Sequence, residues 1–323
     1  MRTQVLAVLL VPVLASAQTV DWSSVLDQPA PWYGTKEAEA VAGRVLSWQR
    51  ADGGWPKDID MVRHAAGQSG RARPDSTIDN GATVTQVRLL DRVFAASANT
   101  RLKDAALRGL DYLLTAQYSN GGWPQFYPLR SDYSRHITFN DDAMTGVLAL
   151  LEDVASTRAL PFTDDARRLR AVKAIDAATT VILRAQVRVD GRLTAWCAQH
   201  DAVTLEPRPA RSYEHASLSG RESVEIVRFL MRRPPQPEVV EAVDAAVAWL
   251  RMVRRSDGSW ARFYEIGTNR PIFSGRDGVV RYDIREISRE RQTGYAWTGM
   301  WPARLVDAEY LRWREQINAS RAR

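Results

Sequence analysis

The sequence predicts a mainly α-helical fold, in which helix pairs form an α/α toroid and two long segments form loops and short strands. A turn containing glycine and tryptophan recurs along the chain, helical periodicity fills the segments between its copies, and two long segments lack helix signals. An open helical bundle without toroidal closure is the alternative that the same pattern allows.

The recurring turn places a glutamine a few residues before an Asp-Gly or Asn-Gly pair and a tryptophan. Its copies are Gln49 with Asp52-Gly53-Gly54-Trp55-Pro56, Gln117 with Asn120-Gly121-Gly122-Trp123-Pro124, Gln186 with Asp190-Gly191 and Trp196, and Ser256-Asp257-Gly258-Ser259-Trp260. The period of roughly 65 to 73 residues is too long for one helical hairpin of the short solenoid families. It is long enough for two helices and a functional loop.

Apolar residues between the turns follow helical spacing. Leu110, Leu113 and Leu114 share one face of a helix, as do Met144, Val147 and Leu148. Helices are therefore expected near residues 36–50, 80–96, 101–117, 141–157, 164–186, 221–232, 238–255 and 296–315. Residues 188–220 and 256–295 are rich in Gly, Pro and aromatic residues, so they are expected to form loops and short strands that carry function.

The first 17 residues read as an export signal rather than as part of the fold. Arg2 gives a positive start, residues 5–14 are apolar, and Ala15-Ser16-Ala17 is a small-residue cleavage site. We expect cleavage near Ala17, one domain over residues 18–323, and a secreted protein, periplasmic or extracellular, that works as a monomer. No later apolar run is long enough for a membrane anchor.

Composition narrows the class of partner. The 323 residues are 45% hydrophobic and 25% charged, and the single cysteine, Cys197, excludes an intrachain disulfide and a cysteine-rich zinc site. The net charge of +6 suits an acidic polymer, although a solvated basic surface without a partner explains the charge equally well. Nucleic acid is disfavoured, because no Lys/Arg tract or zinc-finger spacing is present.

Polar residues concentrate at three junctions between a loop and a helix: STIDNGAT from Ser76, ITFNDDAM from Ile137 and RSYEHASLSGRES from Arg211. The first two carry carboxylate and amide side chains at the start of successive predicted helices, namely Asp79, Asn80, Asn140, Asp141 and Asp142. Such oxygens suit a hard cation such as Ca²⁺. Because Asp and Asn are also preferred helix caps, capping remains the alternative for each junction.

The chain resembles the family 10 polysaccharide lyases, which are pectate lyases, over about residues 30–315. The resemblance rests on the segments GGWPKDIDM, TIDNGAT, GGWPQFYPL, ITFNDDAM, TAWCAQHD, SGRDGVVRY and TGYAWTG. It implies an incomplete (α/α)₃ toroid with a second lobe. It also implies Ca²⁺-assisted β-elimination on α-1,4-linked polygalacturonate, in which calcium bridges substrate and protein carboxylates.

The resemblance also implies roles for individual residues. Asp79, Asn80 and Asp141, with Asp142 beside them, are expected at the metal site, and Arg211 is the expected base. Arg276 and Arg291 are expected to bind uronate, and Trp123 and Tyr213 to contact the sugar, with packing in the core as the alternative for the aromatic side chains.

The assignment of the base stays open. An arginine normally keeps its proton, so Lys57 in GGWPKD is the chemically easier base, and Arg211 could instead form an ion pair with Glu214 or Glu206.

Three other functions fit parts of the pattern. A glycoside hydrolase on the same scaffold could use Asp79 and Asp141 as acid and base. A noncatalytic pectin-binding protein would show the same charges. A terpene-cyclase-like enzyme is disfavoured, because Asp141-Asp142 lacks a third aspartate at DDxxD spacing and no DxDD segment exists.

Overall fold

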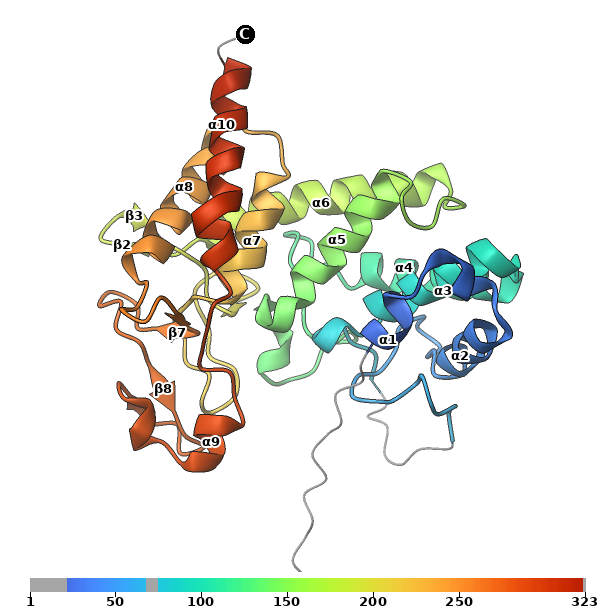
Figure 1. Ribbon diagram of the computed structural model, residues 1–323, viewed down its shortest axis with the longest axis horizontal. Coiled ribbons are helices and arrows are strands. Elements are labelled where there is room, and N and C mark those ends of the chain that lie inside the picture. Colours follow the sequence, from blue (N-terminus) through green and yellow to red (C-terminus); the bar gives the residue numbers. More distant parts are fainter. Residues whose placement is uncertain (1–21, 68–74, 322–323) are drawn as a thin grey trace, which may run out of the picture.

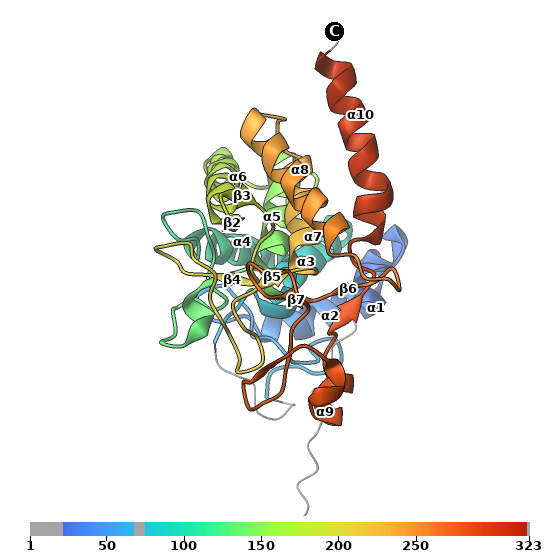
Figure 2. The same cartoon turned by 90° about the vertical axis from the view of Figure 1, so that its left-hand side faces the viewer.

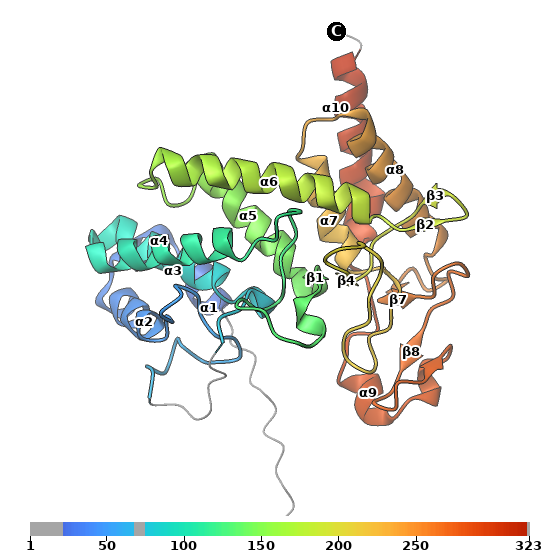
Figure 3. The ribbon, with the colours of Figure 1, turned by 180° about the vertical axis from the view of Figure 1, so that it is seen from behind.

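The computed structural model describes residues 22–67 and 75–321, and it is mainly helical with short two-stranded sheets, as predicted (Figure 1). The predicted export signal lies outside the described residues. Helix pairs follow one another along the chain, and the first and last pairs lie at opposite ends of the molecule, so the ring is not closed (Figures 1 and 3).

Each repeat contributes a first helix, a tryptophan turn and a second helix. The first helices are α2 (Lys36–Ser47), α4 (Thr100–Thr115), α6 (Asp165–Ala185) and α8 (Pro237–Met252). The second helices are α3 (Val84–Ser97), α5 (Ala143–Ala155), α7 (Glu222–Met231) and, after the π-helical turn η6 (Leu305–Glu309), α10 (Tyr310–Arg321). A short helix α1 (Ser23–Leu26) and the turn η1 (Ala30–Gly34) pack on α3.

Seven of the eight helices expected from the sequence are present at nearly the expected positions. The prediction for residues 296–315 is wrong in its first half, where β10 (Thr298–Gly299) pairs with β6 (Trp260–Ala261). Helix begins only after Pro302, which lacks the amide hydrogen that a helix interior needs. Residues 296–302 therefore form a strand and a turn that lead into the helix, and helical periodicity alone cannot distinguish them from it.

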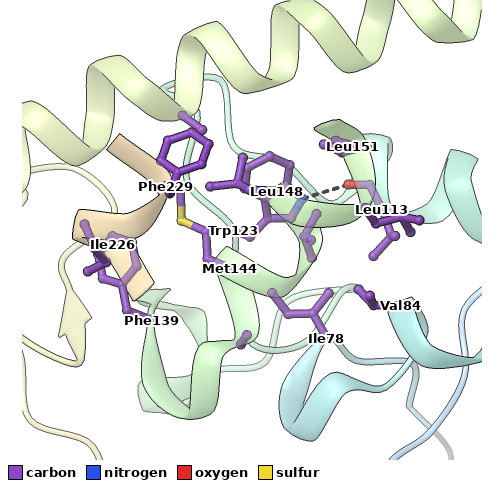
Figure 4. Close-up of a cluster of buried hydrophobic side chains, with 14 of the residues drawn as sticks. Ile78, Val84, Leu113, Trp123, Phe139, Met144, Leu148, Leu151, Ile226 and Phe229 are labelled. Carbon is purple, nitrogen blue, oxygen red and sulfur yellow. Dashed lines mark hydrogen bonds between the residues drawn. The ribbon is translucent and has the colours of Figure 1, made fainter. Parts of the chain in front are cut away.

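The recurring tryptophans fasten each turn to the helix before it. The indole N–H groups of Trp55, Trp123, Trp196 and Trp260 donate to the carbonyls of Val45, Leu113, Ile182 and Leu250, at 2.7–2.8 Å. All four rings are fully buried. Figure 4 shows Trp123 bonded to Leu113 among the core residues Met144, Leu148 and Phe229.

The glutamine of each of the first three turns bonds both to its own turn and to the next repeat. Gln117 donates to the carbonyls of Gly121 and Ala174, and Gln49 and Gln186 make the equivalent pair of bonds. Glycine is required where the helices approach most closely: at Gly121, with φ +100°, an added Cβ would lie 2.3 Å from the backbone of Ala177.

Short backbone pairings join successive repeats at the end of the molecule that carries the junctions. The residues Thr77, Thr138 and Ser219 pair with Phe126, Gln199 and Phe263, each of which is the third residue after a tryptophan. The next amide in each junction donates to the residue before that partner: Ile78 to Gln125, Phe139 to Ala198 and Gly220 to Arg262. We call this series the rim ladder, and it fixes the junctions relative to one another.

The strands of the ladder are two residues each: β1 (Ile137–Thr138) with β4 (Gln199–His200), and β5 (Leu218–Ser219) with β7 (Phe263–Tyr264). The segments expected to be loop-rich also contain β2 (Arg188–Val189), β3 (Arg192–Leu193), β8 (Phe273–Ser274), β9 (Val280–Arg281) and α9 (Arg289–Thr293). The part with β8 and α9, which we call the outer lobe, lies apart from the paired helices (Figures 1 and 2) and has its own small core around Phe263 and Trp297. Within the described residues, no helix is long and apolar enough to cross a bilayer.

His200 holds the loop after β4 in place. The ring is fully buried, its Nε2 accepts from the amide of Cys197 at 3.0 Å, and its Nδ1 donates to the carbonyl of Leu205 at 2.8 Å. Burial lowers the pKa of His200 to about 4. A neutral ring with the proton on Nδ1 is therefore built into the strand that carries Gln199.

We predict that this histidine makes the protein sensitive to acid. In the unfolded chain this histidine has its ordinary pKa of about 6.5, so it becomes protonated below that pH. In the folded protein it stays neutral until the pH falls to about 4. Stability should therefore fall as pH drops through this window, by about 3 kcal/mol from this group. Urea unfolding at several pH values measures it: His200→Gln should flatten the slope, whereas the exposed His64→Gln should not. Equal slopes for both variants would contradict the prediction.

Candidate functional site

A small polar cavity of about 70 Å³ lies where the first two junctions meet the segment after β4. It is lined by Lys57, Asp79, Asn80, Gln125, Tyr133, Asn140, Asp141, Gln199, Arg211 and Glu214. Five residues predicted for the site therefore come together: Lys57, Asp79, Asn80, Asp141 and Arg211. The rim ladder explains the convergence, because it holds the junctions side by side.

The two junctions are structural copies of each other. Each forms one 3-10 turn, η2 (Asp79–Gly81) or η4 (Asn140–Asp142), immediately before a helix of the core. Asp79 corresponds to Asn140, while Asn80, with φ 52°, corresponds to Asp141, with φ 49°. The left-handed conformation at this second position favours Asn and Asp over other non-glycine residues. The two aspartates therefore occupy different places in equivalent turns.

Helix capping does not explain these side chains. The N-cap residues of α3 and α5 are Thr83 and Asp142, and neither makes a side-chain hydrogen bond to its helix. The capping alternative is therefore wrong for both junctions. Asp79, Asn80, Asn140 and Asp141 line the cavity instead.

Asp79 is a buried carboxylate with one cationic partner. It is 2% exposed, and its Oδ2 forms a short ion pair with the Lys57 ammonium. Its Oδ1 is buried and has no hydrogen-bond partner. Lys57 also lies 3.9 Å from Asp58 Oδ2 and 5.9 Å from the centre of the Phe126 ring. A buried carboxylate oxygen without a partner is costly, so it marks a place for a ligand.

Asp141 is held from behind by two arginines. Arg262, nearly buried, donates through Nη2 to Asp141 Oδ1 at 2.9 Å and to Glu222 Oε1 at 2.5 Å, and Arg221 lies 3.4 Å from the same aspartate oxygen. Burial would raise the pKa of Asp141, but the charge and hydrogen bond of Arg262 outweigh it, so the pKa is lowered. Asp141 is therefore ionised over the whole neutral range.

Arg211 is fixed by Glu214. Its Nε and Nη2 donate to the two carboxylate oxygens at 2.7 and 2.5 Å, and its backbone amide donates to the same carboxylate at 3.2 Å. The Tyr295 hydroxyl donates to Glu214 at 2.7 Å, and the Arg211 guanidinium lies 5.8 Å from the centre of the Tyr295 ring. Burial alone would lower the pKa of Arg211, but the bonds and charge of Glu214 raise it.

The expected ion pair of Arg211 with Glu214 is thus present. Arg211 also lines the cavity, which fits its predicted role as the base.

Asp142 departs from the predicted metal site. It does not line the cavity, and its carboxylate lies 3.3 Å from Arg221 Nη2 beside a separate groove along α5. In the copied turns it corresponds to Gly81, the third residue, which explains why its side chain is placed apart from Asp141. Burial and the neighbouring carboxylates raise its pKa to about 6, although Arg221 opposes them.

The side-chain oxygens that line the cavity are of the kind that calcium binds, but they are too few to surround the ion completely. The lining offers carboxylate and amide oxygens, including the unpartnered Oδ1 of Asp79. Among the described residues, however, no three His, Cys, Asp or Glu side chains are grouped closely enough to hold a metal ion by themselves. Asp79, Asn80 and Asp141 would therefore hold Ca²⁺ only with amide oxygens, water or substrate completing its shell.

The residues expected to contact the sugar lie elsewhere. The prediction for Trp123 is wrong, because its ring is fully buried and serves the fold. Tyr213 is 7% exposed, and its ring lies between Arg211 and Arg291 at 5.0 and 4.9 Å, so it supports these arginines rather than offering a surface. Arg276 and Arg291 both pair with Glu290 in the outer lobe and do not line the cavity.

Sequence reasoning missed Gln125, Tyr133, Gln199 and Arg262. Three of them have a simple signal in the repeat. Lys57, Gln125 and Arg262 each stand two residues after a recurring tryptophan, and Gln199 stands three residues after one. Alignment of the repeats on tryptophan would therefore have found these positions. Tyr133 lies in a 3-10 turn, η3 (Tyr133–Arg135), for which we find no sequence signal.

The chain is similar to known proteins of one family. The family model described as pectic acid lyase matches residues 49–258 and 250–306. A family 10 polysaccharide lyase from Cellvibrio cellulosa is 38% identical over 92% of this chain and 100% of its own, with a TM-score of 0.79. An aspartate-to-alanine mutant of a family 10 lyase from the same organism, in complex with trigalacturonic acid, is 40% identical over 87% and 97%, with a TM-score of 0.78. No curated protein gave a significant match.

We predict that Arg262 is essential to the stability of the site. Arg262→Met should lower the free energy of unfolding by about 3–5 kcal/mol, because it leaves the buried Glu222 and the partly exposed Asp141 with one cation fewer. Arg276→Met removes a largely exposed ion pair and should change little. Urea titration of both variants measures the difference. Similar midpoints would show that the buried cluster contributes no more than a surface pair.

Proposed function

This chain belongs to the pectic acid lyase family and is a polysaccharide lyase, and we propose that its polar cavity cleaves polygalacturonate by calcium-assisted β-elimination. The observation that carries the proposal is the convergence of Asp79, Asn80, Asp141 and Arg211 on one cavity. The relative in complex with trigalacturonic acid supports galacturonate as the substrate class.

The charges of the cavity support the use of a cation. Its lining contains two cationic side chains, Lys57 and Arg211, and three carboxylates, Asp79, Asp141 and Glu214. An anionic sugar entering this cavity meets an excess of negative charge, which opposes binding unless a cation compensates it. Calcium, when bound, would pair with the uronate carboxylate and make the neighbouring C5 proton more acidic.

The side chains then have distinct tasks. Asp79, Asn80 and Asp141 would hold calcium, and Arg211 would take the proton from C5. The electron pair of the C5–H bond forms the C4–C5 double bond, and the C4–O bond breaks with its electrons leaving on oxygen. That oxygen finally takes up a proton, so hydrolysis by water is not involved.

Arg211 is the proposed base despite its pairing with Glu214. The fixed guanidinium is suited to reach one substrate atom repeatedly, because both of its bonds to Glu214 and the Tyr295 ring restrain it. Glu214 also holds the proton on Arg211, so activity should rise with pH. Lys57, which is paired with Asp79, remains the alternative base.

The rival hydrolase is disfavoured by the environments of its two candidate carboxylates. A glycosidase needs one carboxylic acid that stays protonated. The pKa of Asp141 is lowered, which disfavours it as that acid, and Asp79 is already engaged in an ion pair with the Lys57 ammonium. We further propose that the protein acts outside the cytoplasm as a monomer, which rests on the signal in residues 1–17 and on the polymeric substrate.

The first test of the function concerns the product. Digestion of polygalacturonate should yield unsaturated uronates that absorb ultraviolet light, and a chelator should abolish their release until calcium is restored. Reducing ends without the ultraviolet signal would mean hydrolysis. Binding of the polymer without any product would mean a noncatalytic binding protein.

The second test concerns the base. Arg211→Ala and Arg211→Lys should lower kcat by roughly 10²–10⁴-fold, since the proton acceptor and its orientation are lost. Arg276→Ala, in the outer lobe, should affect KM more than kcat if the residue binds uronate. Steady-state kinetics, with folding checked by circular dichroism, separates the variants. Near-normal turnover of Arg211→Ala together with loss of turnover in Lys57→Ala would assign the base to Lys57.

A further inference from the structure

We propose that Lys57 competes with calcium for Asp79, so that the cavity takes up the metal only by moving this ammonium to Asp58. The inference rests on the proposed function insofar as that function requires calcium. It concerns side chains of this chain whose exchange no family assignment describes. Three features of the structure carry it.

The first feature is that the Lys57 ammonium already occupies the position beside Asp79 where a cation would bind. Lys57 Nζ forms its short ion pair with Asp79 Oδ2 inside the cavity, where the aspartate is 2% exposed. A dication bound to this carboxylate would lie within a few ångströms of the ammonium. Two like charges at that distance in a poorly solvated site repel strongly, so both cannot keep full contact with Asp79.

The second feature is that Asp79 has an unused oxygen. Its Oδ1 is buried and unpartnered although the carboxylate lines the cavity. The ammonium alone therefore leaves the carboxylate half satisfied. A calcium ion, which accepts carboxylates in one-oxygen or two-oxygen contact, could satisfy the atom that Lys57 does not reach.

The third feature is that Lys57 has another place to go. Asp58 Oδ2 is 3.9 Å from Nζ, and the Asp58 side chain is 42% exposed. The ring of Phe126 lies 5.9 Å from the same nitrogen and can face a cation. A rotation of the flexible lysine stem would thus exchange a buried carboxylate for a solvated one without leaving the ammonium unpaired.

The exchange gives the site a threshold for the metal. Calcium must displace the Lys57 ammonium before it can bind Asp79. The affinity of the substrate-free protein for calcium is therefore lowered. A uronate carboxylate offers Ca²⁺ an additional ligand and offers the displaced Lys57 a further anion. Metal binding and substrate binding should therefore strengthen each other.

The test measures calcium binding rather than turnover. In calorimetric titrations of the substrate-free protein with CaCl₂, Lys57→Met should bind calcium at least tenfold more tightly than the wild type. Lys57→Arg, which keeps the charge, should bind as weakly as the wild type. Lys36→Met, which removes an exposed lysine at the start of α2, is the matched control and should leave affinity unchanged.

A calcium affinity of Lys57→Met equal to or weaker than that of the wild type would overturn the inference, as would no binding at all. Circular dichroism confirms that each variant is folded, and Lys57→Gln serves if Lys57→Met is not. The chelator experiment on the wild-type enzyme decides the calcium requirement independently. A chelator-sensitive lyase whose lysine variants bind calcium no better would therefore retain the proposed function and lose only this exchange.

Discussion

The site depends on one repeated hydrogen bond. In each of three repeats a junction amide donates to the carbonyl two residues after the next tryptophan: Ile78 to Gln125, Phe139 to Ala198 and Gly220 to Arg262. The tryptophans anchor the acceptor segments to their helices. The rim ladder therefore transmits the spacing of the helix core to the polar turns, and Asp79 and Asp141, 62 positions apart in the printed sequence, come to line one cavity.

The same register explains how charge is distributed in the site. The position two residues after a tryptophan faces a junction, and the chain places Lys57 there in the first repeat and Arg262 in the last. Each meets a carboxylate, Asp79 or Asp141. The Lys57–Asp79 pair and the Arg262–Asp141 pair differ in how freely the cationic side chain can move. Arg262 is nearly buried and shared with Glu222, so it stiffens the back of the cavity. Lys57 is held by Asp79 alone at close range and has Asp58 beside it, so it can move.

Much of this arrangement could be predicted from the sequence, because the tryptophan turns and the apolar spacing recur. The helices and the convergence of the two Asp-bearing junctions follow from that repetition. Periodicity alone could not place Trp123, since a turn tryptophan can cover a helix end from inside the core or from the surface. The structure places the ring in the core, where it bonds to the carbonyl of Leu113. Nor could periodicity separate Asp141 from Asp142, which are adjacent in sequence but diverge because both have positive φ.

The pairing of Arg211 with Glu214 bears on why an arginine could serve as a base at all. The Arg211 guanidinium bonds to Glu214 through Nε and Nη2, which leaves Nη1 outside this pair and able to face a sugar. The carboxylate also stabilises the protonated guanidinium, raises its pKa and so opposes loss of the proton. Every cation added nearby acts in the other direction. Calcium would raise the positive potential of the cavity and so favour release of a proton from Arg211. We therefore expect the Arg211 guanidinium to release its proton more readily when calcium is bound than in the metal-free cavity.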